Sequence, residues 1–459
     1  MYQIDFKHPV HIYFVGIGGI SMSGLAEILH DAGFTVSGSD WKESPITKHL
    51  EEKGIKVSYG EDASHVTDDI EVAVLTSAVR DSNLEFQAIL AKGIPYMMRA
   101  ELLGQLMLNY QTSIAISGTH GKTTTTSMVS QVLLEADTDP TLTIGGILKS
   151  IGGNLRIGGH DIFVTEACEY TNSFLSFFPK IGLILNIEED HLDFFKDIND
   201  IRQSFRKFAE LIPADGALII NGEIPNWQEI AKDLPCKVVT FGFGEDLDYH
   251  PADIHYDTLA CASFDAITPG QAPFALKLSV PGNHNVSNAL ATLALADLVG
   301  IDRQTAAQGL LHFTGTDRRF EYKGQKDGIT IIDDYAHHPT EITATLTAAQ
   351  SYPHQNLWCV FQPHTYTRTQ AFLKEFAQAL SLADKVVLAD IYAAREVNTI
   401  GITSQAIADE LQKLGKECYY LPSFEEIEKF LLKNCINGDL LITMGAGDVH
   451  KIGENLLQN

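Results

Sequence analysis

Short apolar runs alternate with amphipathic stretches along the first hundred residues. The apolar run HIYFV (11–15) precedes a glycine turn and the helical pattern MSGLAEILHDAG (22–33). The strand patterns FTVSGSD (34–40) and EVAVLTSAV (71–79) follow, and a further helix begins near Asn83. Repeated strand and helix units of this length are typical of a parallel sheet covered by helices. The sequence therefore predicts an α/β fold for this part of the chain.

The same alternation restarts twice. The run SIAIS (113–117) leads through a glycine loop into a threonine-rich helical pattern, and the strand patterns DIFVTE (161–166) and IGLILNIEEDH (181–191) end in acidic residues. In open α/β sheets, ligands gather beyond the carboxyl ends of the strands, so these acidic residues are placed to meet the loop. A third series of strand-like segments begins around Gly328. We predict three α/β domains, formed by residues 1–109, 110–317 and 318–459.

The composition supports packed cores and a strongly acidic surface. Apolar residues make up 45% of the 459 residues, and 59 acidic against 33 basic residues give a formal net charge of −26. Such a surface repels nucleic acid and anionic membranes, so we expect neither as a partner. Bound phosphate must be held locally, by backbone N–H groups, a few cations or a metal ion.

The six cysteines show no C-x-x-C pair and no spacing typical of metal ligands. This usage is typical of a reduced, cytoplasmic protein. The N-terminus lacks the basic start and apolar run of a signal peptide, and no stretch approaches the roughly 18 apolar residues of a membrane span. We therefore expect a soluble protein of the cytoplasm.

The first glycine loop, GIGGISMSG (16–24), follows a strand and opens a helix, and Asp40 ends the next strand. This order is that of a dinucleotide-binding fingerprint, except that its third glycine falls on Ser21. The loop indicates a nucleotide whose phosphates lie at a helix N-terminus, without specifying NAD. A tight strand-to-helix turn is the alternative, but three glycines in four residues are more than such a turn needs.

The second glycine loop, SGTHGKTTTT (117–126), resembles a phosphate-binding loop with one irregularity. The pattern G-x-x-x-x-G-K-[ST] requires glycine where this chain has Ile116, and Gly118 comes two residues later. Lys122 nevertheless supplies a cation for phosphate oxygens, and Thr123 supplies a hydroxyl for Mg²⁺. One chain thus carries two candidate nucleotide sites.

Two further segments suggest ligands for a metal and for a base. Mg²⁺ prefers oxygen ligands, and Glu166 at a strand end suits it. His191, in NIEEDHLD, is either a less usual metal ligand or a histidine satisfied by hydrogen bonds. His284 and Asn288, in PGNHNVSNA, can bracket the edge of an adenine or simply begin a capped helix.

Eight segments, in this order along the chain, resemble the Mur ligases. They are GIGGISMSG, GTHGKTTT, EACEYTNSFL, NIEEDHLDFF, PGNHNVSNA, GTDRRFE, DDYAHHPTEI and FQPHTYTRT. Together they span essentially the whole chain and form a specific signature. The resemblance also accounts for the missing glycine, because the loop of this family has the short form GTxGK[ST].

The resemblance implies why one chain needs two nucleotide loops. The first domain would be a Rossmann-like domain that binds a UDP-sugar, the second a P-loop ATPase-like domain with a parallel sheet, and the third a Rossmann-like α/β domain that binds an amino acid. In the alanine-adding branch, ATP phosphorylates the carboxylate of UDP-N-acetylmuramate, and the amine of L-alanine attacks the acyl phosphate to give an amide, ADP and phosphate. An activated intermediate of this kind overcomes the poor reactivity of a carboxylate as an acyl donor.

The resemblance also implies a set of site residues. Those for the UDP-sugar are Gly16, Gly18, Gly19, Ile20, Ser21, Asp40 and Ser77. Those for ATP are Gly118, Thr119, His120, Gly121, Lys122, Thr123, Thr124, His284, Asn288, Arg319 and Asp334. The alanine pocket would consist of Tyr335, His337, His364 and Arg368. The catalytic residues would be Lys122, Glu166, His191 and His337, with Thr123, Glu166 and His191 as metal ligands.

The implied cofactors are ATP and two Mg²⁺ ions, one held by Thr123 and Glu166 and the second by His191. The implied partners are small molecules, namely UDP-N-acetylmuramate, L-alanine and ATP, and the chain is expected to act as a monomer or a weak homodimer. Arg368 is the natural partner of the alanine carboxylate, although a surface cation at a helix start is the commoner role of a lone arginine.

This chain departs from the pattern of the family at two informative positions. Members that add later amino acids carry a carbamylated lysine where this chain has Phe205, so we expect no such modification, as in the alanine-adding branch. Thr365 stands where some alanine-adding members have arginine, which leaves the grip on the carboxylate more dependent on Arg368.

Three rival functions remain open on the sequence. An NAD-linked oxidoreductase explains the first loop and Asp40 but leaves the second loop unused. A nucleotide-switched binding module needs the second loop but no amino-acid pocket. Within the family, the competitor is a ligase that attaches a preformed tripeptide to the same sugar, although the GIGGIS and QPHTYTR segments favour free alanine.

Overall fold

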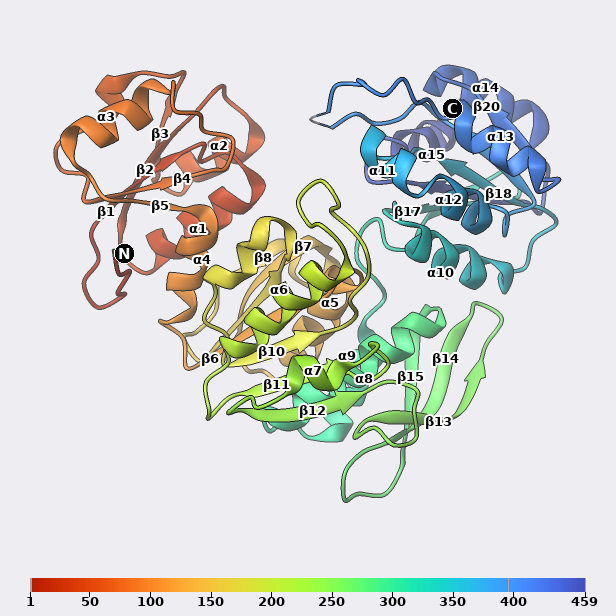
Figure 1. The fold of residues 1–459 in the computed structure, drawn as a ribbon, viewed down its shortest axis with the longest axis horizontal. Coiled ribbons are helices and arrows are strands. Elements are labelled where there is room, and N and C mark those ends of the chain that lie inside the picture. Colours follow the sequence, from red (N-terminus) through yellow and green to blue (C-terminus); the bar gives the residue numbers. More distant parts are fainter. Residues whose placement is uncertain (1, 395, 459) are drawn as a thin grey trace.

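The computed structural model describes residues 2–394 and 396–458, which form three successive α/β regions (Figure 1). The N-terminal region, coloured red to orange, has a parallel sheet of order β3-β2-β1-β4-β5. Because the strand order reverses beside β1, the crevice at its carboxyl end is the expected ligand position. The elements are β1 (His11–Val15), α1 (Ile20–Asp31), β2 (Thr35–Asp40), α2 (Pro45–Glu52), β3 (Lys56–Tyr59), β4 (Val72–Leu75), α3 (Leu84–Lys92), β5 (Tyr96–Met98) and α4 (Arg99–Met107).

The central region, yellow to green in Figure 1, has a seven-stranded sheet of order β12-β11-β10-β6-β9-β7-β8. Its strands are parallel except for β8, which pairs antiparallel with β7 at the edge. The strands are β6 (Thr112–Ser117), β7 (Thr141–Leu148), β8 (Gly153–Arg156), β9 (Ile162–Ala167), β10 (Ile181–Ile184), β11 (Ala217–Asn221) and β12 (Lys237–Phe241). The helices are α5 (Lys122–Glu135), α6 (Ile198–Glu210), α7 (Trp227–Ala231), α8 (Asn283–Leu298) and α9 (Arg303–His312).

A separate antiparallel sheet, which the sequence analysis did not predict, follows the central sheet. It consists of β13 (His250–Tyr256), β14 (Cys261–Ile267) and β15 (Phe274–Pro281). Buried and partly exposed residues alternate along β14, as expected for strands with one covered face, and this face joins the core of the central region. The alternation is visible in the sequence as CASFDAI (261–267), but the sequence analysis considered only the helical pattern that follows it.

The C-terminal region, teal to blue in Figure 1, has a six-stranded sheet of order β16-β17-β21-β18-β19-β20. Only the edge strand β16 pairs antiparallel. The strands are β16 (Glu321–Lys326), β17 (Ile329–Asp334), β18 (Leu357–Phe361), β19 (Lys385–Leu388), β20 (Glu417–Tyr420) and β21 (Leu440–Met444). The helices are α10 (Pro339–Gln350), α11 (Tyr366–Ala371), α12 (Leu373–Leu380), α13 (Gln405–Lys413), α14 (Phe424–Asn434) and α15 (His450–Gln458).

Buried apolar strands fix the ends of the loops that carry polar residues. Every residue of β10 and of β18 is buried, which is typical of a parallel strand covered on both faces. The abbreviated loop before α5 needs its glycines: Gly118 has φ 143°, and a Cβ there would lie 2.9 Å from Cβ of Leu185. A side chain at this position would push the loop away from the end of β10.

Among the described residues, no helix is both long and apolar enough to cross a membrane.

Candidate active site

Lys122 begins α5 and is held by the loop that precedes it. Its Nζ donates to the carbonyl oxygens of Gly118 at 2.5 Å and Thr119 at 3.1 Å, and it pairs with a carboxylate oxygen of Glu169 at 3.0 Å. Burial alone would lower the pKa of Lys122, but Glu169 outweighs burial and raises it. The lysine therefore stays a cation beside the helix N-terminus, a combination that attracts phosphate.

Thr123, the second residue of α5, and Glu166, near the end of β9, provide oxygen atoms suited to Mg²⁺. Thr123 Oγ1 donates to Glu166 Oε2 at 3.1 Å, and the second carboxylate oxygen of Glu166 accepts the N–H of Gly145 at 2.6 Å. Burial raises the pKa of Glu166. A partly buried carboxylate beside a hydroxyl fits a hard cation, which would stabilise the charged form of the acid.

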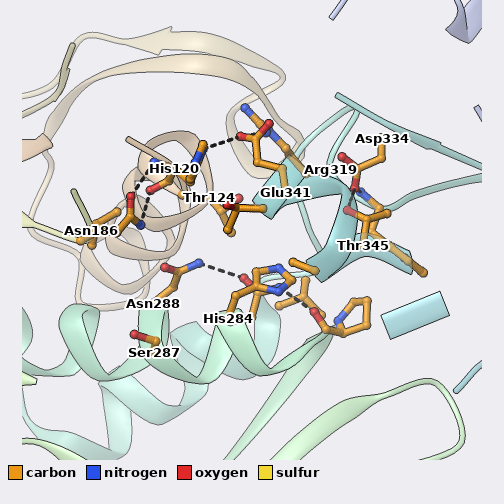
Figure 2. A pocket seen from close by; sticks show the side chains of 18 of the residues that line it. His120, Thr124, Asn186, His284, Ser287, Asn288, Arg319, Asp334, Glu341 and Thr345 are labelled. Carbon is orange, nitrogen blue, oxygen red and sulfur yellow. Dashed lines mark hydrogen bonds and ion pairs between the residues drawn. The ribbon is translucent and has the colours of Figure 1, made fainter. Parts of the chain in front are cut away.

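The first cavity, of about 290 Å³, lies between the phosphate loop, α8 and the C-terminal region (Figure 2). Its lining includes His120, Gly121 and Thr124 of the loop and His284 and Asn288 of α8. Asn288 donates to Oδ1 of Asn285 at 3.1 Å. Desolvation within this cavity lowers the pKa of His284 to about 4, so the imidazole is neutral at pH 7 and can exchange hydrogen bonds with a base.

Arg319 and Asp334 close the same cavity from the C-terminal region (Figure 2). The Asp334 carboxylate accepts N–H groups of Phe320 and Ala336 at 2.9 and 2.7 Å and the hydroxyl of Thr345 at 3.1 Å. Burial raises the pKa of Asp334 to about 6, although Arg319 acts in the opposite direction. Asp334 therefore anchors the turn after β17 as well as lining the cavity.

The second cavity, of about 1100 Å³, has walls from all three regions. The N-terminal region contributes Ser77 and Arg99, the central region contributes His191, and the C-terminal region contributes His364 and Arg368. Predicted UDP-sugar, metal and amino-acid residues therefore meet in this cavity.

Arg368 is already paired in this cavity, with a residue that the sequence analysis did not single out. Its Nη2 and Nε lie 2.8 and 3.3 Å from Oδ1 of Asp190, and its Nη1 lies 3.2 Å from Nδ1 of His364. Burial alone would raise the pKa of Asp190, but Arg368 and the neighbouring His191 hold it well below its usual range. Arg368 is thus a largely covered, ion-paired cation in the wall of the cavity and not a solvated surface cation.

His191 lies against Tyr170, with ring centroids 4.5 Å apart, and its Nε2 is 3.7 Å from Glu169. Burial lowers the pKa of His191 against the opposing effect of Asp190. A neutral imidazole is the form that binds metal ions. The residue also has φ 53°, in the left-handed region, which turns the backbone sharply after β10.

The predicted alanine pocket is only partly assembled around the second cavity. His364 and Arg368 line it, whereas Tyr335 and His337 do not, although the His337 ring centroid lies 5.8 Å from that of His364. Nδ1 of His337 lies 3.0 Å from the carbonyl oxygen of Tyr335, so it is the protonated nitrogen and Nε2 keeps a lone pair. Burial lowers the pKa of both histidines to about 4, and both are neutral at pH 7.

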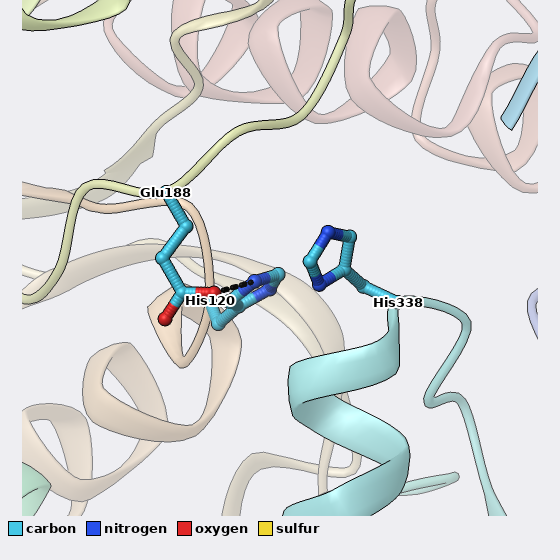
Figure 3. Close-up of side chains that lie close together, drawn as sticks. All are labelled: His120, Glu188 and His338. Atoms are coloured by element: carbon cyan, nitrogen blue, oxygen red, sulfur yellow. Dashed lines mark ion pairs between the residues drawn. The ribbon is translucent and has the colours of Figure 1, made fainter. Parts of the chain in front are cut away.

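His120 of the phosphate loop joins the central and C-terminal regions (Figure 3). Its Nε2 lies 3.4 Å from Glu188 of the loop after β10, and its Nδ1 lies 3.3 Å from Glu341 of α10. Burial alone would lower the pKa of His120, but the two carboxylates outweigh burial and raise it to about 9. His120 is therefore an imidazolium between two carboxylates that come from different regions.

His120, Glu188 and His338 also lie close enough to be considered as metal ligands (Figure 3). The two imidazoles face one another, however, with centroids 4.6 Å apart and 36° between their planes, so their in-plane lone pairs do not converge. Nε2 of His338 is hydrogen-bonded to the carbonyl oxygen of Glu189 at 3.1 Å, and Nδ1 accepts the N–H of Thr340 at 3.4 Å. The cluster fits an ion-paired contact between regions better than a metal centre.

The first glycine loop lies beside a third cavity, of about 310 Å³, at the carboxyl ends of β1, β2 and β4. Gly16 and Asp40 line this cavity, and Gly18 donates its N–H to Oδ2 of Asp40 at 2.8 Å. A Cβ on Gly18 would lie 2.8 Å from that oxygen, so the close approach requires glycine.

Ser21, in place of the third glycine, is accommodated in α1, and its Oγ accepts a hydrogen bond from Arg99 at 3.0 Å. Gly19 caps α1, and Ile20 is 68% exposed at its start.

Phe205 occupies the position where other members of the family carry a modified lysine. Its ring is fully buried in α6 and packs edge-on against Phe174, with centroids 5.4 Å apart. The side chain is part of the apolar core.

Three family descriptions match the chain in sequence order. Residues 11–111 match "Mur ligase family, catalytic domain", residues 116–296 match "Mur ligase middle domain", and residues 318–447 match "Mur ligase, glutamate ligase domain". These matches together cover most of the chain, and the chain belongs to the Mur ligase family.

Individual relatives cover the full length. The chain is 63% identical to the UDP-N-acetylmuramate--L-alanine ligase of Agathobacter rectalis, over 100% of both chains. It is similar to the crystal structure of the UDP-N-acetylmuramate-alanine ligase of Thermotoga maritima, with a TM-score of 0.79, 31% identity and 98% of each chain covered. It is also similar to a murein peptide ligase of Psychrobacter arcticus, with a TM-score of 0.70, 26% identity and 98% of each chain covered.

Proposed function

We propose that this chain is an ATP-dependent ligase that joins L-alanine to the carboxylate of UDP-N-acetylmuramate during synthesis of peptidoglycan precursors. The observation that supports this most directly is the second cavity, whose walls come from all three regions. A ligase with three substrates needs such a meeting point, whereas an oxidoreductase or a nucleotide switch does not. The full-length similarity to alanine-adding enzymes favours free alanine over a preformed tripeptide.

The predicted residues would bind the different substrates in different regions of the chain. The phosphate loop and α8 would hold ATP in the first cavity, with Lys122 as the cation for its phosphates. The first glycine loop would hold the diphosphate of the sugar nucleotide, and Ser77 and Arg99 would face its muramoyl end. Such positioning lowers the barrier, because it converts encounters between three substrates into steps within one complex.

ATP and Mg²⁺ are the cofactors of this family, and the oxygen ligands of Thr123 and Glu166 fit one ion. The ion supplies positive charge that offsets the phosphate oxygens. We propose His191 as the residue beside a second ion. Its neutral imidazole and its place in the second cavity support this role.

The alanine amine would be held by neutral imidazoles and its carboxylate by Arg368. Nε2 of His337 keeps a lone pair because Nδ1 donates to Tyr335, so Nε2 can accept a hydrogen bond from the amine. The amine nitrogen would then bond to the carbonyl carbon as the bond from that carbon to the phosphate oxygen breaks, and the proton lost by the amine would end on the released hydrogen phosphate. Exclusion of water from this step preserves the activated intermediate from hydrolysis.

We propose the domain boundaries at 109/110 and 317/318. They fall between α4 and β6 and between α9 and β16. Action as a monomer or weak homodimer, and action in the cytoplasm, stay predictions from the sequence.

The decisive experiment measures ADP release. We expect release to require both UDP-N-acetylmuramate and L-alanine, each saturating in the presence of Mg²⁺. Product from a diaminopimelate-containing tripeptide but not from alanine would instead identify the tripeptide-adding activity. ADP release that depends on neither would point to a nucleotide switch.

A further inference from the structure

The residue directly before α11 has a strained backbone. Thr365 has φ 63° and ψ 148°, a combination that β-branched residues rarely adopt. Such a conformation is costly and persists only where the surrounding structure holds it. Thr365 lines the second cavity, between His364 and the short helix that carries Arg368. The contacts that hold Thr365 therefore also determine how Arg368 faces the cavity.

The segment between β19 and α13 supplies the first of these contacts. The N–H of Tyr392 donates to the carbonyl oxygen of Pro363 at 2.8 Å, and the carbonyl oxygen of Tyr392 accepts the N–H of Thr365 at 2.9 Å. The ring of Tyr392 also stacks on that of His364, with centroids 5.6 Å apart and 21° between the planes. The backbone on the N-terminal side of Thr365 is thereby fixed.

Glu396, in the same segment, holds the backbone on the other side of Thr365. Its Oε2 accepts the N–H of Tyr366 at 2.6 Å and that of Thr367 at 3.0 Å, and its Oε1 accepts the hydroxyl of Thr367. The first N–H groups of a helix have no partner within the helix, and the side chain of Thr365 caps none of them. Glu396 thus takes the place of an N-cap from a distant part of the chain, and its charge suits the positive end of the helix.

The carboxylate of Glu396 lines the second cavity, which is proposed to receive anionic substrates. An unpaired carboxylate at this place would repel phosphate and carboxylate groups. Both oxygens of Glu396, however, already accept hydrogen bonds from the first two residues of α11. This use of the charge accounts for a carboxylate in the wall of an anion site.

Arg368 is the third residue of α11, so its direction depends on how this helix begins. The carbonyl oxygen of Thr365 accepts the N–H of Thr369 at 3.2 Å and its hydroxyl at 2.7 Å, which links the strained residue to the turn that contains Arg368. From this turn the guanidinium contacts Asp190 and His364. A loosened start of α11 would widen the range of positions open to the guanidinium, whose fork binds a carboxylate well only in one orientation.

We propose that Glu396 is a positioning residue for amino-acid capture. It holds the start of α11, with the strained Thr365, so that Arg368 presents its guanidinium to the carboxylate of L-alanine. The inference rests on the proposed function, which supplies the amino acid, and it adds a residue that acts through Arg368. The carboxylate of alanine takes no part in the bond changes, so its grip contributes equally to the ground state and the transition state. Loss of Glu396 is therefore expected in the KM for alanine and not in kcat.

The test is the steady-state kinetics of the full chain, measured as ADP release with ATP and UDP-N-acetylmuramate saturating. We expect Glu396→Ala to raise the KM for L-alanine roughly 5- to 30-fold, which corresponds to the loss of a helix cap of about 1–2 kcal/mol. The values of kcat and of the KM for ATP should stay unchanged. Glu375→Ala is the matched control and should change none of the three constants, because Glu375 is an exposed carboxylate in the first turn of the neighbouring helix α12.

Two conservative variants separate hydrogen bonding from charge. Glu396→Gln keeps an acceptor oxygen of the same reach, so its KM for alanine should fall between those of the wild type and Glu396→Ala. Glu396→Asp keeps the charge but is shorter by one methylene group, so it should lose the contacts and resemble Glu396→Ala. A wild-type KM in Glu396→Asp, together with an Ala-like KM in Glu396→Gln, would show that the charge acts at a distance and would overturn the positioning role. Far-UV circular dichroism verifies that each variant is folded.

A double variant tests whether Glu396 acts through Arg368. On an Arg368→Ala background, Glu396→Ala should lower kcat/KM for alanine much less than it does in the wild type, because the group that it positions is already absent. An equal loss on both backgrounds would overturn the inference.

The remaining outcomes separate this inference from the proposed function. A KM for alanine within two-fold of wild type in Glu396→Ala would overturn the positioning role, while alanine-dependent ADP release by the wild type would still support the ligase. Absence of that release in the wild type would overturn both.

Discussion

His120 predicts a pH-dependent docking of the C-terminal region on the central region. The side chain is 11% exposed and lies between Glu188 and Glu341, with His338 stacked against it as a further titratable neighbour. When the regions separate, His120 loses Glu341 but keeps Glu188, which lies in its own region, so its pKa falls from about 9 only part of the way toward the ordinary value of 6.5. At about 1.4 kcal/mol per pKa unit, the whole shift corresponds to about 3 kcal/mol, which is the upper limit of the contribution of His120 to docking.

The sign of the effect follows from the raised pKa in the docked state. The contribution is complete below about pH 6.5 and is lost as the pH rises through about 9. The variant His120→Gln lacks the titrating cation, so its docking should already be weakened at pH 7. Its docking should then change less than that of the wild type between pH 7 and pH 10.

Small-angle X-ray scattering of the ligand-free protein measures this directly. We expect the radius of gyration of the wild type to rise between pH 7 and pH 10 and that of His120→Gln to be larger at pH 7 and nearly constant. His312→Gln is the matched control, because its exposed pair with Glu135 lies within the central region. An equal expansion of wild type and His120→Gln with pH would refute the reasoning.

Changes at three residues and one alternative substrate test the proposed site. Lys122→Ala should abolish ligation with UDP-sugar affinity nearly intact, because the two nucleotides bind in different regions; equal loss of sugar binding by calorimetry would contradict this division. His191→Ala should lower kcat at least 100-fold, since one transition-state stabiliser contributes about 3–4 kcal/mol; near-normal turnover at modest Mg²⁺ would mark a merely hydrogen-bonded histidine. Arg368→Ala should raise the KM for alanine far more than that for ATP, and Arg368→Lys should restore little because the bidentate fork is lost; a change confined to ATP would exclude the proposed role. In the wild type, glycine should react about 10–200 times less efficiently than L-alanine, because one methyl group in a pocket discriminates only weakly; a complete block to glycine would contradict this.

The sequence was most informative where local patterns decide the structure. The apolar runs at His11–Val15 and Leu357–Phe361 became buried parallel strands, and Pro339 begins α10, as its fixed φ favours. The two glycine loops were recognisable because close backbone approach excludes a side chain. The helix after the second loop begins at Lys122, directly where the loop pattern ends.

The side chains that pair with the predicted site residues could not be predicted from the sequence. Asp190 was visible as part of an acidic strand end, but its pairing with Arg368 joins residues 178 positions apart in different regions. Glu169 follows a buried strand, yet no spacing indicated that it would hold Lys122. Such contacts depend on how the regions pack, and periodicity along the chain carries no information about that packing.

The pairing of Asp190 with Arg368 makes amino-acid capture an exchange of carboxylates. If Arg368 receives alanine, as proposed, the incoming carboxylate replaces one that already satisfies the guanidinium, so the two Coulomb energies largely cancel. Affinity is then set by the small difference between them, and the arginine is never left bare in a buried site. The same exchange runs in reverse after the amide has formed: Asp190 can reclaim Arg368 and so displace the product, which still carries the carboxylate of alanine.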